Sequence, residues 1–194
     1  MARYVLASRN EGKVRELARI LPDVDLVGLE RYPDAPEVAE TGVSFEENAL
    51  LKACAIATFT GSPAVADDSG LCVDALNGMP GIFSARWSGV HGDDKANLDL
   101  LLAQIADVPD ERRQANFTCA AALARPDGSS HVVLGRVDGR LIREPKGSGG
   151  FGYDPIFVPD GYDRTTAEMS AEEKDAISHR GKAFRAIAPY IRGT

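Results

Sequence analysis

Strand-like and helix-like segments alternate along this chain, and that alternation limits the fold more than any other feature of the sequence. Residues 4–7 ("YVLA") and 63–66 ("PAVA") are short apolar runs, whereas residues 14–21 repeat their apolar side chains at helical spacing. Residues 114–124 and 131–142 are strand-like, and the turn-forming "RPDGSS" between them predicts a hairpin. This mixture predicts an α/β protein in which helices flank a mixed β-sheet.

Four further helices are predicted from their starting signals. Two of them open with a capping box, in which a serine is followed three residues later by glutamate. The predicted helices begin at about residues 44, 93, 170 and 179, with the capping boxes at Ser44 and Ser170. The first is expected to run to about Phe59, where Gly61 and Pro63 end it, and Pro189 is expected to end or kink the last.

The composition fits an enzyme of ordinary size. A chain of 194 residues with 44% hydrophobic content can bury one substantial core, so we expect a single domain covering residues 1–194. The net charge of −7 argues against nucleic-acid or membrane partners. No apolar stretch approaches the roughly 20 residues of a membrane span, and "MARYVLAS" is too short for a signal peptide. We therefore expect a cytoplasmic protein.

The cysteines and histidines are scattered along the chain. The three cysteines lack a C-x-x-C pair and are expected to be small core residues; they are Cys54, Cys72 and Cys119. The three histidines have no paired ligand spacing; they are His91, His131 and His179. Any metal should therefore be a hard cation held by carboxylates.

The segment "SRNEGK", residues 8–13, joins a predicted strand to a predicted helix. Backbone N–H groups, the helix dipole and a cationic side chain would converge there, which favours a phosphate ligand. The spacing Gly-x4-Gly-Lys-Ser/Thr is absent, so the segment is not a P-loop. The alternative is that Arg9 and Lys13 are solvated loop residues.

The acidic pair Asp67 and Asp68 follows the apolar run "PAVA", and we expect both at the end of a buried strand. Carboxylates there are costly unless a cation or hydrogen-bond donors balance them. Successive strand residues point to opposite faces, so the two should have different roles. One could bind Mg²⁺ or activate water while the other accepts hydrogen bonds. The alternative is an Asx-turn in "DDSG" without catalysis.

The segment "GSGGFG", residues 147–152, matches the dinucleotide pattern G-x-G-x-x-G. That pattern must open a helix, but the following "YDPIFVP" predicts a strand, so a dinucleotide site is not expected. The glycines more plausibly permit a tight loop that presents Phe151 for stacking.

Five blocks together resemble the inosine/xanthosine triphosphate pyrophosphatase family, that is, the dITP/XTP pyrophosphatases. They are "ASRNEGKVREL", "ETGVSFEENALLKA", "ADDSGLCVDALNGMPGIFSARWSG", "GSGGFGYDPIFVP" and "AEMSAEEKDAISHRGKA", in that order. The resemblance implies an elongated mixed α/β fold with two lobes around a central cleft, and a homodimer. It also implies Mg²⁺-dependent hydrolysis of deaminated purine nucleoside triphosphates to the monophosphate and pyrophosphate, which clears them from the nucleotide pool.

The resemblance also assigns residues to the triphosphate and the metal. Ser8, Asn10 and Lys13 would meet phosphate oxygens, in a substrate loop that comprises Ser8, Arg9, Asn10, Glu11, Gly12 and Lys13. Arg9 departs from the small residue expected after Ser8. Lys52 would add a second cation. Glu40 and Asp68 match the metal-linked acids, and Asp68 is the expected general base.

The remaining assignments concern the nucleoside and the substrate site beside Asp68. They are Ser69, Phe151, Gly152, Tyr153, Asp154, Lys174, His179 and Arg180. Chemistry supports this division of roles, because a triphosphate carries about four negative charges that Mg²⁺ and lysines must neutralise as water attacks. Mg²⁺ keeps several waters and needs only one or two protein carboxylates.

Several alternatives remain open. Taken singly, Lys52 could be a solvated helix residue, Glu40 a loop charge, Phe151 a core residue and His179 a helix cap. A non-hydrolysing nucleotide sensor could use the same basic loop and aromatic contact, although it would have no use for a placed acid pair. A related pyrophosphatase with pyrimidine preference is a nearer rival, but the match of "SHRG" to the purine-site block argues against it.

Overall fold

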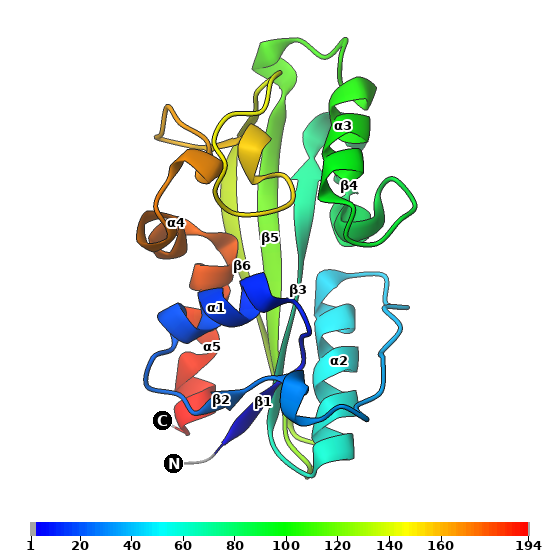
Figure 1. Ribbon diagram of the computed structural model, residues 1–194, viewed down its shortest axis with the longest axis vertical. Coiled ribbons are helices and arrows are strands. Elements are labelled where there is room, and N and C mark those ends of the chain that lie inside the picture. The colour runs from blue at the N-terminus through cyan, green and yellow to red at the C-terminus, as the bar shows by residue number, and fades with distance from the viewer. Residues whose placement is uncertain (1–2, 194) are drawn as a thin grey trace. The chain divides into compact units, whose positions relative to one another are not determined.

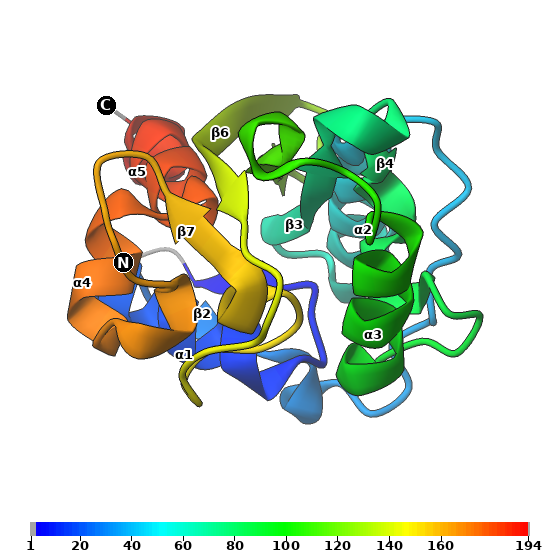
Figure 2. The ribbon, with the colours of Figure 1, turned by 90° about the horizontal axis from the view of Figure 1, so that it is seen from above.

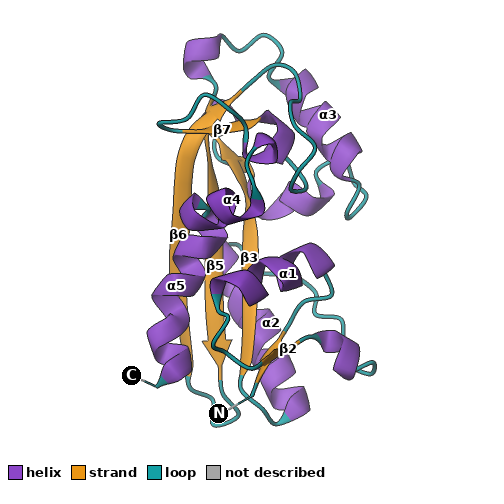
Figure 3. Cartoon of the chain, turned by 60° about the vertical axis from the view of Figure 1, so that its left-hand side comes forward, coloured by secondary structure: helices purple, strands orange, loops and turns teal. Residues whose placement is uncertain are grey.

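The computed structural model describes residues 3–193, which form two compact units. Unit 1 consists of the residues up to 68 together with 119–135 and those from 179 onward; unit 2 consists of residues 69–118 and 136–178. A seven-stranded sheet has the order β2-β1-β3-β5-β6-β7, with β4 paired to β3. The unit boundaries fall within its three long strands, which Figure 3 shows in orange: β3 (Ala64–Val73), β5 (Gln114–Ala124) and β6 (Ser130–Leu141).

Unit 1 places three helices around its strands, and Figure 1 shows α1 and α5 on one side of β3 with α2 on the other. Its further elements are β1 (Tyr4–Leu6), α1 (Glu11–Ile20), β2 (Leu26–Val27), the 3₁₀ turn η1 (Leu29–Arg31), α2 (Phe45–Thr60) and α5 (His179–Arg192). Strand β1 pairs in parallel with both β2 and β3. Leu17 of α1 and Phe184 of α5 pack with Val65 of β3 in one buried cluster. This cluster fixes both helices on that face of the sheet.

Unit 2 has its own apolar core, in which Phe117 meets Phe157 edge to face with ring centroids 4.8 Å apart. Its helices and short strands are β4 (Met79–Pro80), α3 (Asp94–Gln104), β7 (Phe157–Pro159) and α4 (Ala171–Ile177). Its 3₁₀ turns are η2 (Asp74–Leu76), η3 (Gly81–Arg86), η4 (Asp110–Arg112), η5 (Asp154–Ile156) and η6 (Thr166–Glu168). Strand β7 pairs antiparallel with β6, as Figure 2 shows from above. The predicted α/β fold with a mixed sheet is therefore confirmed.

The predicted helix ends are largely confirmed. Ser44 caps α2 by accepting from the Glu47 backbone N–H, and Gly61 ends the helix with a positive φ of 64°. The Glu47 carboxylate, however, accepts from the N–H of Val43, one residue before the expected partner. The capping box opened by Ser170 is complete. Of the two effects expected of Pro189, an end to the helix is not observed, because α5 continues past it to Arg192.

The three cysteines form no disulfide within the described residues, and Cys72 is only partly buried. Cys119 is a buried core residue, but Cys54 is exposed on α2, so the prediction of core positions was wrong for Cys54. In the described part of the chain, no helix is long and apolar enough to cross a membrane.

Arg113 is a buried side chain that organises unit 2 by donating to backbone carbonyls. Its Nε donates to the carbonyl of Leu141 (3.1 Å), and its Nη1 donates to the carbonyl of Ile105 (2.8 Å). A third donor, Nη2, lies 3.4 Å from the carbonyl of Ile142. One guanidinium thus ties the end of α3 to the end of β6.

We expect Arg113→Met to lower the free energy of unfolding by about 2–4 kcal/mol, because buried carbonyls lose their charged donor. Urea denaturation monitored by circular dichroism measures this loss. Arg112→Met is the matched control, since Arg112 is exposed, and it should change stability by less than about 0.5 kcal/mol. Equal stability of the two variants would contradict the role given to Arg113.

Candidate active site

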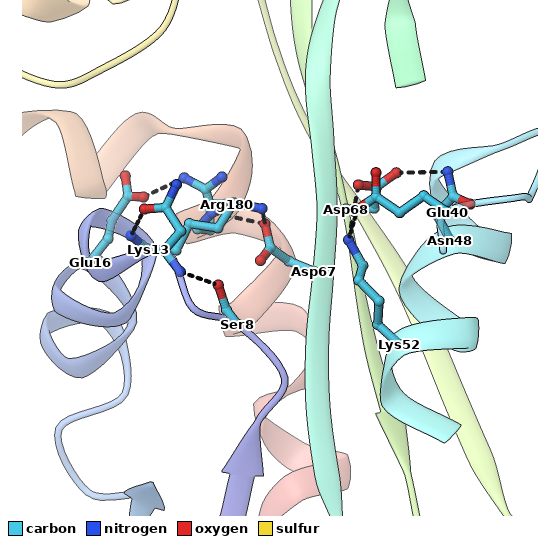
Figure 4. Close-up of polar contacts among 10 residues, drawn as sticks. Ser8, Lys13, Glu16, Glu40, Asn48, Lys52, Asp67, Asp68 and Arg180 are labelled. Carbon is cyan, nitrogen blue, oxygen red and sulfur yellow. Dashed lines mark hydrogen bonds and ion pairs between the residues drawn. The ribbon is translucent and has the colours of Figure 1, made fainter. Parts of the chain in front are cut away.

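The acidic pair lies in the middle of β3 and not at a strand end, which corrects the sequence prediction. The strand continues to Val73, and both Asp67 and Asp68 are buried within it. The alternative of an Asx-turn is therefore also wrong. Figure 4 shows the two side chains leaving β3 on opposite sides, as strand geometry requires. The expectation that the two side chains point to opposite faces of the strand is confirmed.

On one side of β3, Asp68 contacts two polar side chains of α2. Its Oδ1 lies 3.1 Å from the Lys52 ammonium, and its Oδ2 accepts from Asn48 Nδ2 at 3.2 Å. The same ammonium lies 2.7 Å from Glu40 Oε1, so one cation bridges two carboxylates. Lys52 is thus not simply solvated, and Glu40 is not a lone loop charge.

The environment of Asp68 changes its proton affinity. Burial, the largest influence, raises its pKa, and the neighbouring Glu40 charge acts in the same direction against the opposing effect of Lys52. The pKa of Lys52 is also raised: burial opposes its charge most strongly, but the surrounding carboxylates Asp68, Asp67 and Glu40 outweigh burial. A carboxylate with a raised pKa is a better proton acceptor than an exposed one.

On the other side of β3, Asp67 contacts two cations. Lys13 Nζ of α1 and Arg180 Nε of α5 each lie 3.1 Å from its Oδ2. Arg180 also pairs with Glu16 of α1 through Nη1. Burial alone would raise the pKa of Asp67, but Lys13 and Arg180 outweigh it and hold this pKa well below its usual range. Asp67 is therefore a buried carboxylate whose charge is balanced by two cations.

The predicted substrate loop leads into the N-terminus of α1. Asn10 caps this helix by accepting from the Lys13 backbone N–H (3.1 Å), and Ser8 Oγ accepts from the Asn10 N–H (3.1 Å). Arg9 donates to the carbonyl of Ala35 at 3.0 Å. Gly12 lies in the first turn, and the side chain of Glu11 is outside the described part. The turn and helix start expected for a phosphate site are present.

In unit 2, Asp154 fixes the glycine-rich loop. Its Oδ2 accepts from the Phe151 backbone N–H (2.9 Å) and from Lys174 Nζ (2.7 Å), while Thr166 donates to Oδ1 (2.7 Å). Gly150 has φ of +69°, and a Cβ there would lie only 2.0 Å from the Asp154 carboxylate. This packing explains why the loop requires glycine.

The same carboxylate orients a candidate stacking surface. Lys174 Nζ lies 4.9 Å from the centroid of the Phe151 ring, and Phe151 is 37% exposed. Phe151 is therefore not a core residue. A partly exposed aromatic ring beside a buried ammonium suits an aromatic heterocycle.

The other predicted residues have these positions within their own units. Tyr153 is buried and its hydroxyl donates to the Ser84 carbonyl (2.8 Å), while the Gly152 N–H donates to Asp94 (2.8 Å). Ser69 is partly buried in β3. His179 is the buried first residue of α5.

The residues that sequence reasoning missed are buried polar partners. They are Glu16, Asn48 and Thr166. Asp94, which accepts from the Gly152 N–H, was missed as well, although it is exposed. Asn48 had a signal, since it lies one helical turn before Lys52 and therefore on the same face of α2. The others resembled ordinary surface residues, because only tertiary packing reveals their partners.

Glu40 and Asp68 are the residues that suit a divalent cation. Within residues 3–193, no group of three or more histidine, cysteine or acidic side chains could hold a metal. Glu40 and Asp68 nevertheless converge on one ammonium, so their oxygens already face a single positive charge. Mg²⁺ requires only one or two carboxylates because it retains water ligands. The donor set therefore fits Mg²⁺.

Structural comparison identifies the class of fold. A Ham1 protein from Coxiella burnetii superposes with a TM-score of 0.89 at 38% identity, covering 100% of both chains. A dITP/XTP pyrophosphatase from Mycobacterium abscessus superposes with a TM-score of 0.79 at 58% identity, covering 96% of this chain and 99% of that one. This chain has the mixed α/β fold of those proteins.

Sequence comparison agrees. The chain is 66% identical to a dITP/XTP pyrophosphatase from Streptomyces coelicolor over 99% of its own length and 98% of that protein. The family model described as the Ham1 family matches residues 4–190. The chain belongs to the Ham1 family.

Proposed function

We propose that this protein hydrolyses deaminated purine nucleoside triphosphates, namely dITP, ITP and XTP, to the monophosphate and pyrophosphate. The main support for this proposal is the buried Asp68, whose carboxylate contacts the same Lys52 ammonium as Glu40. Two relatives named dITP/XTP pyrophosphatase match nearly the whole chain, which supports the same activity here. We further propose that residues 1–194 act as one catalytic domain, in the cytoplasm and as a homodimer, as the family resemblance implies.

In unit 1, Lys13 and the N-terminus of α1 bind phosphate oxygens, with Ser8 and Asn10 shaping the loop. Lys52 supplies the second cation. Glu40 and Asp68 hold Mg²⁺, which when bound supplies positive charge to the phosphoryl oxygens. Asp68 accepts a proton from the attacking water, a role that its raised pKa favours.

In unit 2, Phe151 stacks on the purine and the Lys174 ammonium lies beside that face. Asp154 holds both in place through its two contacts. For His179 and Arg180, the proposed role is donation of hydrogen bonds to the base, as the family resemblance implies. The remaining substrate-binding residues in this proposal are Ser69, Gly152 and Tyr153.

Incubation with ITP and Mg²⁺, with pyrophosphate scored separately from orthophosphate, tests the proposal. We expect one pyrophosphate and one inosine monophosphate per ITP consumed. Release of orthophosphate would identify a stepwise phosphatase instead. Tight ITP binding without product would identify a nucleotide sensor. Faster hydrolysis of pyrimidine than of purine triphosphates would identify a related pyrophosphatase with pyrimidine preference.

We expect Lys52→Ala to lower kcat/KM for ITP by about 10- to 100-fold, because a buried cation facing the triphosphate is lost. The ITP/ATP ratio should not change, since Lys52 contacts phosphate and not the base. Steady-state kinetics with both nucleotides measures this. Lys95→Ala is the control, because Lys95 is an exposed lysine paired with Asp99. A changed ITP/ATP ratio with an unchanged kcat/KM for ITP would contradict the assignment of Lys52 to the phosphates.

A further inference from the structure

Asp67 connects two helices that are distant in sequence. Lys13 reaches its Oδ2 from α1, and Arg180 reaches the same oxygen from α5, 113 residues beyond Asp67. The Asp67 side chain is only 1% exposed, so its ionised form depends on these two cations. Figure 4 shows this group on the side of β3 opposite Asp68.

The two cations differ in their access to solvent. The Arg180 side chain is 2% exposed and is held by Glu16 as well as Asp67. The Lys13 side chain is 18% exposed. Lysine has a flexible four-carbon stem, so an unrestrained ammonium would occupy many rotamers. The Asp67 carboxylate selects the one in which the ammonium lies between α1 and β3.

We propose that Asp67 is a positioning residue that fixes the Lys13 ammonium for the phosphates and orients the Arg180 guanidinium. The proposal rests on the proposed function and adds a residue to which that function gave no role. Asp67 acts through these cations and takes no proton from water, because its side chain leaves β3 on the side opposite Asp68.

A double-mutant cycle tests whether Asp67 acts through Lys13. The proteins are wild type, Asp67→Asn, Lys13→Met and the double variant, each checked for folding by circular dichroism and thermal unfolding. We expect Asp67→Asn to lower kcat/KM for ITP by about 10- to 100-fold and to weaken inhibition by inorganic pyrophosphate by a similar factor. In the Lys13→Met protein, Asp67→Asn should lower kcat/KM for ITP by less than about threefold, because the ammonium that Asp67 positions is already absent.

Asp23→Asn is the matched control, since Asp23 pairs with Arg192 on the surface of unit 1. This variant should keep kcat/KM within about twofold of wild type. Multiplicative effects of Asp67→Asn and Lys13→Met would overturn the proposal, because a purely structural role predicts independence. Wild-type kinetics in folded Asp67→Asn would overturn it as well.

A second variant covers the case in which Asp67→Asn does not fold. Asp67→Glu keeps the charge but moves it by one methylene, so Lys13 should be misplaced and the pyrophosphate inhibition constant should rise by at least about threefold. Unchanged inhibition in Asp67→Glu would overturn the proposal. Failure of the proposed function gives a different result, since the wild-type protein would then release no pyrophosphate from ITP.

Discussion

Asp68→Asn should lower the turnover of ITP by about 10²–10⁴-fold while the fold stays intact. Asparagine has nearly the same shape, but it cannot accept the proton of an attacking water. It also supplies a weaker oxygen ligand for Mg²⁺, so the loss should be larger if metal binding fails too. Stopped or continuous measurement of pyrophosphate release at saturating ITP and Mg²⁺ gives kcat directly.

Two comparisons make this result specific to Asp68. The exposed Asp138 offers a matched Asp→Asn change, and that variant should keep wild-type turnover. Asp67→Asn should chiefly raise KM and weaken inhibition by pyrophosphate. Asp68→Asn should instead lower kcat, so its loss of activity should remain at saturating ITP. A folded Asp68→Asn protein with near wild-type turnover would remove Asp68 from catalysis.

The fold was predictable where local sequence determines local structure. Capping residues such as Ser44 and Ser170 bond their own helices, so their signals could be read directly. The length of β3 could not, because two adjacent aspartates normally indicate a turn or a strand end. They continue the strand here because Lys52 on one side and Lys13 with Arg180 on the other balance their charges.

The candidate site was predictable as a set of residues but not as a set of contacts. The sequence could not pair Asp67 with Arg180, because the two approach only when α5 packs on the sheet. In unit 2, the resemblance assigned Asp154 to the nucleoside, and the structure shows that its carboxylate also contacts Phe151, Lys174 and Thr166. These contacts suggest that part of the family resemblance reflects the support of ligand-binding groups.

Base selectivity is the second large effect that we expect. Hypoxanthine and xanthine carry an oxygen acceptor at C6, whereas adenine carries an amino donor. Donors aimed at C6 would meet adenine donor to donor and leave buried groups unpaired, and such sites reject the wrong partner by roughly 10⁴–10⁵-fold. We therefore expect ITP and XTP to be strongly preferred over ATP. Guanine shares the C6 oxygen, so a second group must exclude its 2-amino substituent.

Arg180→Ala tests the source of this selectivity. We expect it to reduce kcat/KM for ITP more than for ATP, which lowers the ITP/ATP ratio of kcat/KM, because a guanidinium can donate to the C6 oxygen of hypoxanthine but not to the C6 amino group of adenine. The change also leaves Asp67 and Glu16 without their shared cation, so unfolding should be measured on the same protein. Arg180→Lys retains the positive charge but lacks the several N–H donors of the guanidinium. It should lower the ITP/ATP ratio of kcat/KM with less loss of stability than Arg180→Ala.

Arg192→Ala is the control on the same helix, because Arg192 is exposed and pairs with Asp23. It should leave both kcat/KM values unchanged. Measuring ITP, XTP, ATP and GTP with each protein separates three outcomes. A narrowed ITP/ATP ratio in both Arg180 variants supports base recognition by the guanidinium. An equal loss with ITP and ATP would instead confine Arg180 to holding Asp67, and an unchanged rate with every nucleotide would exclude it from both roles.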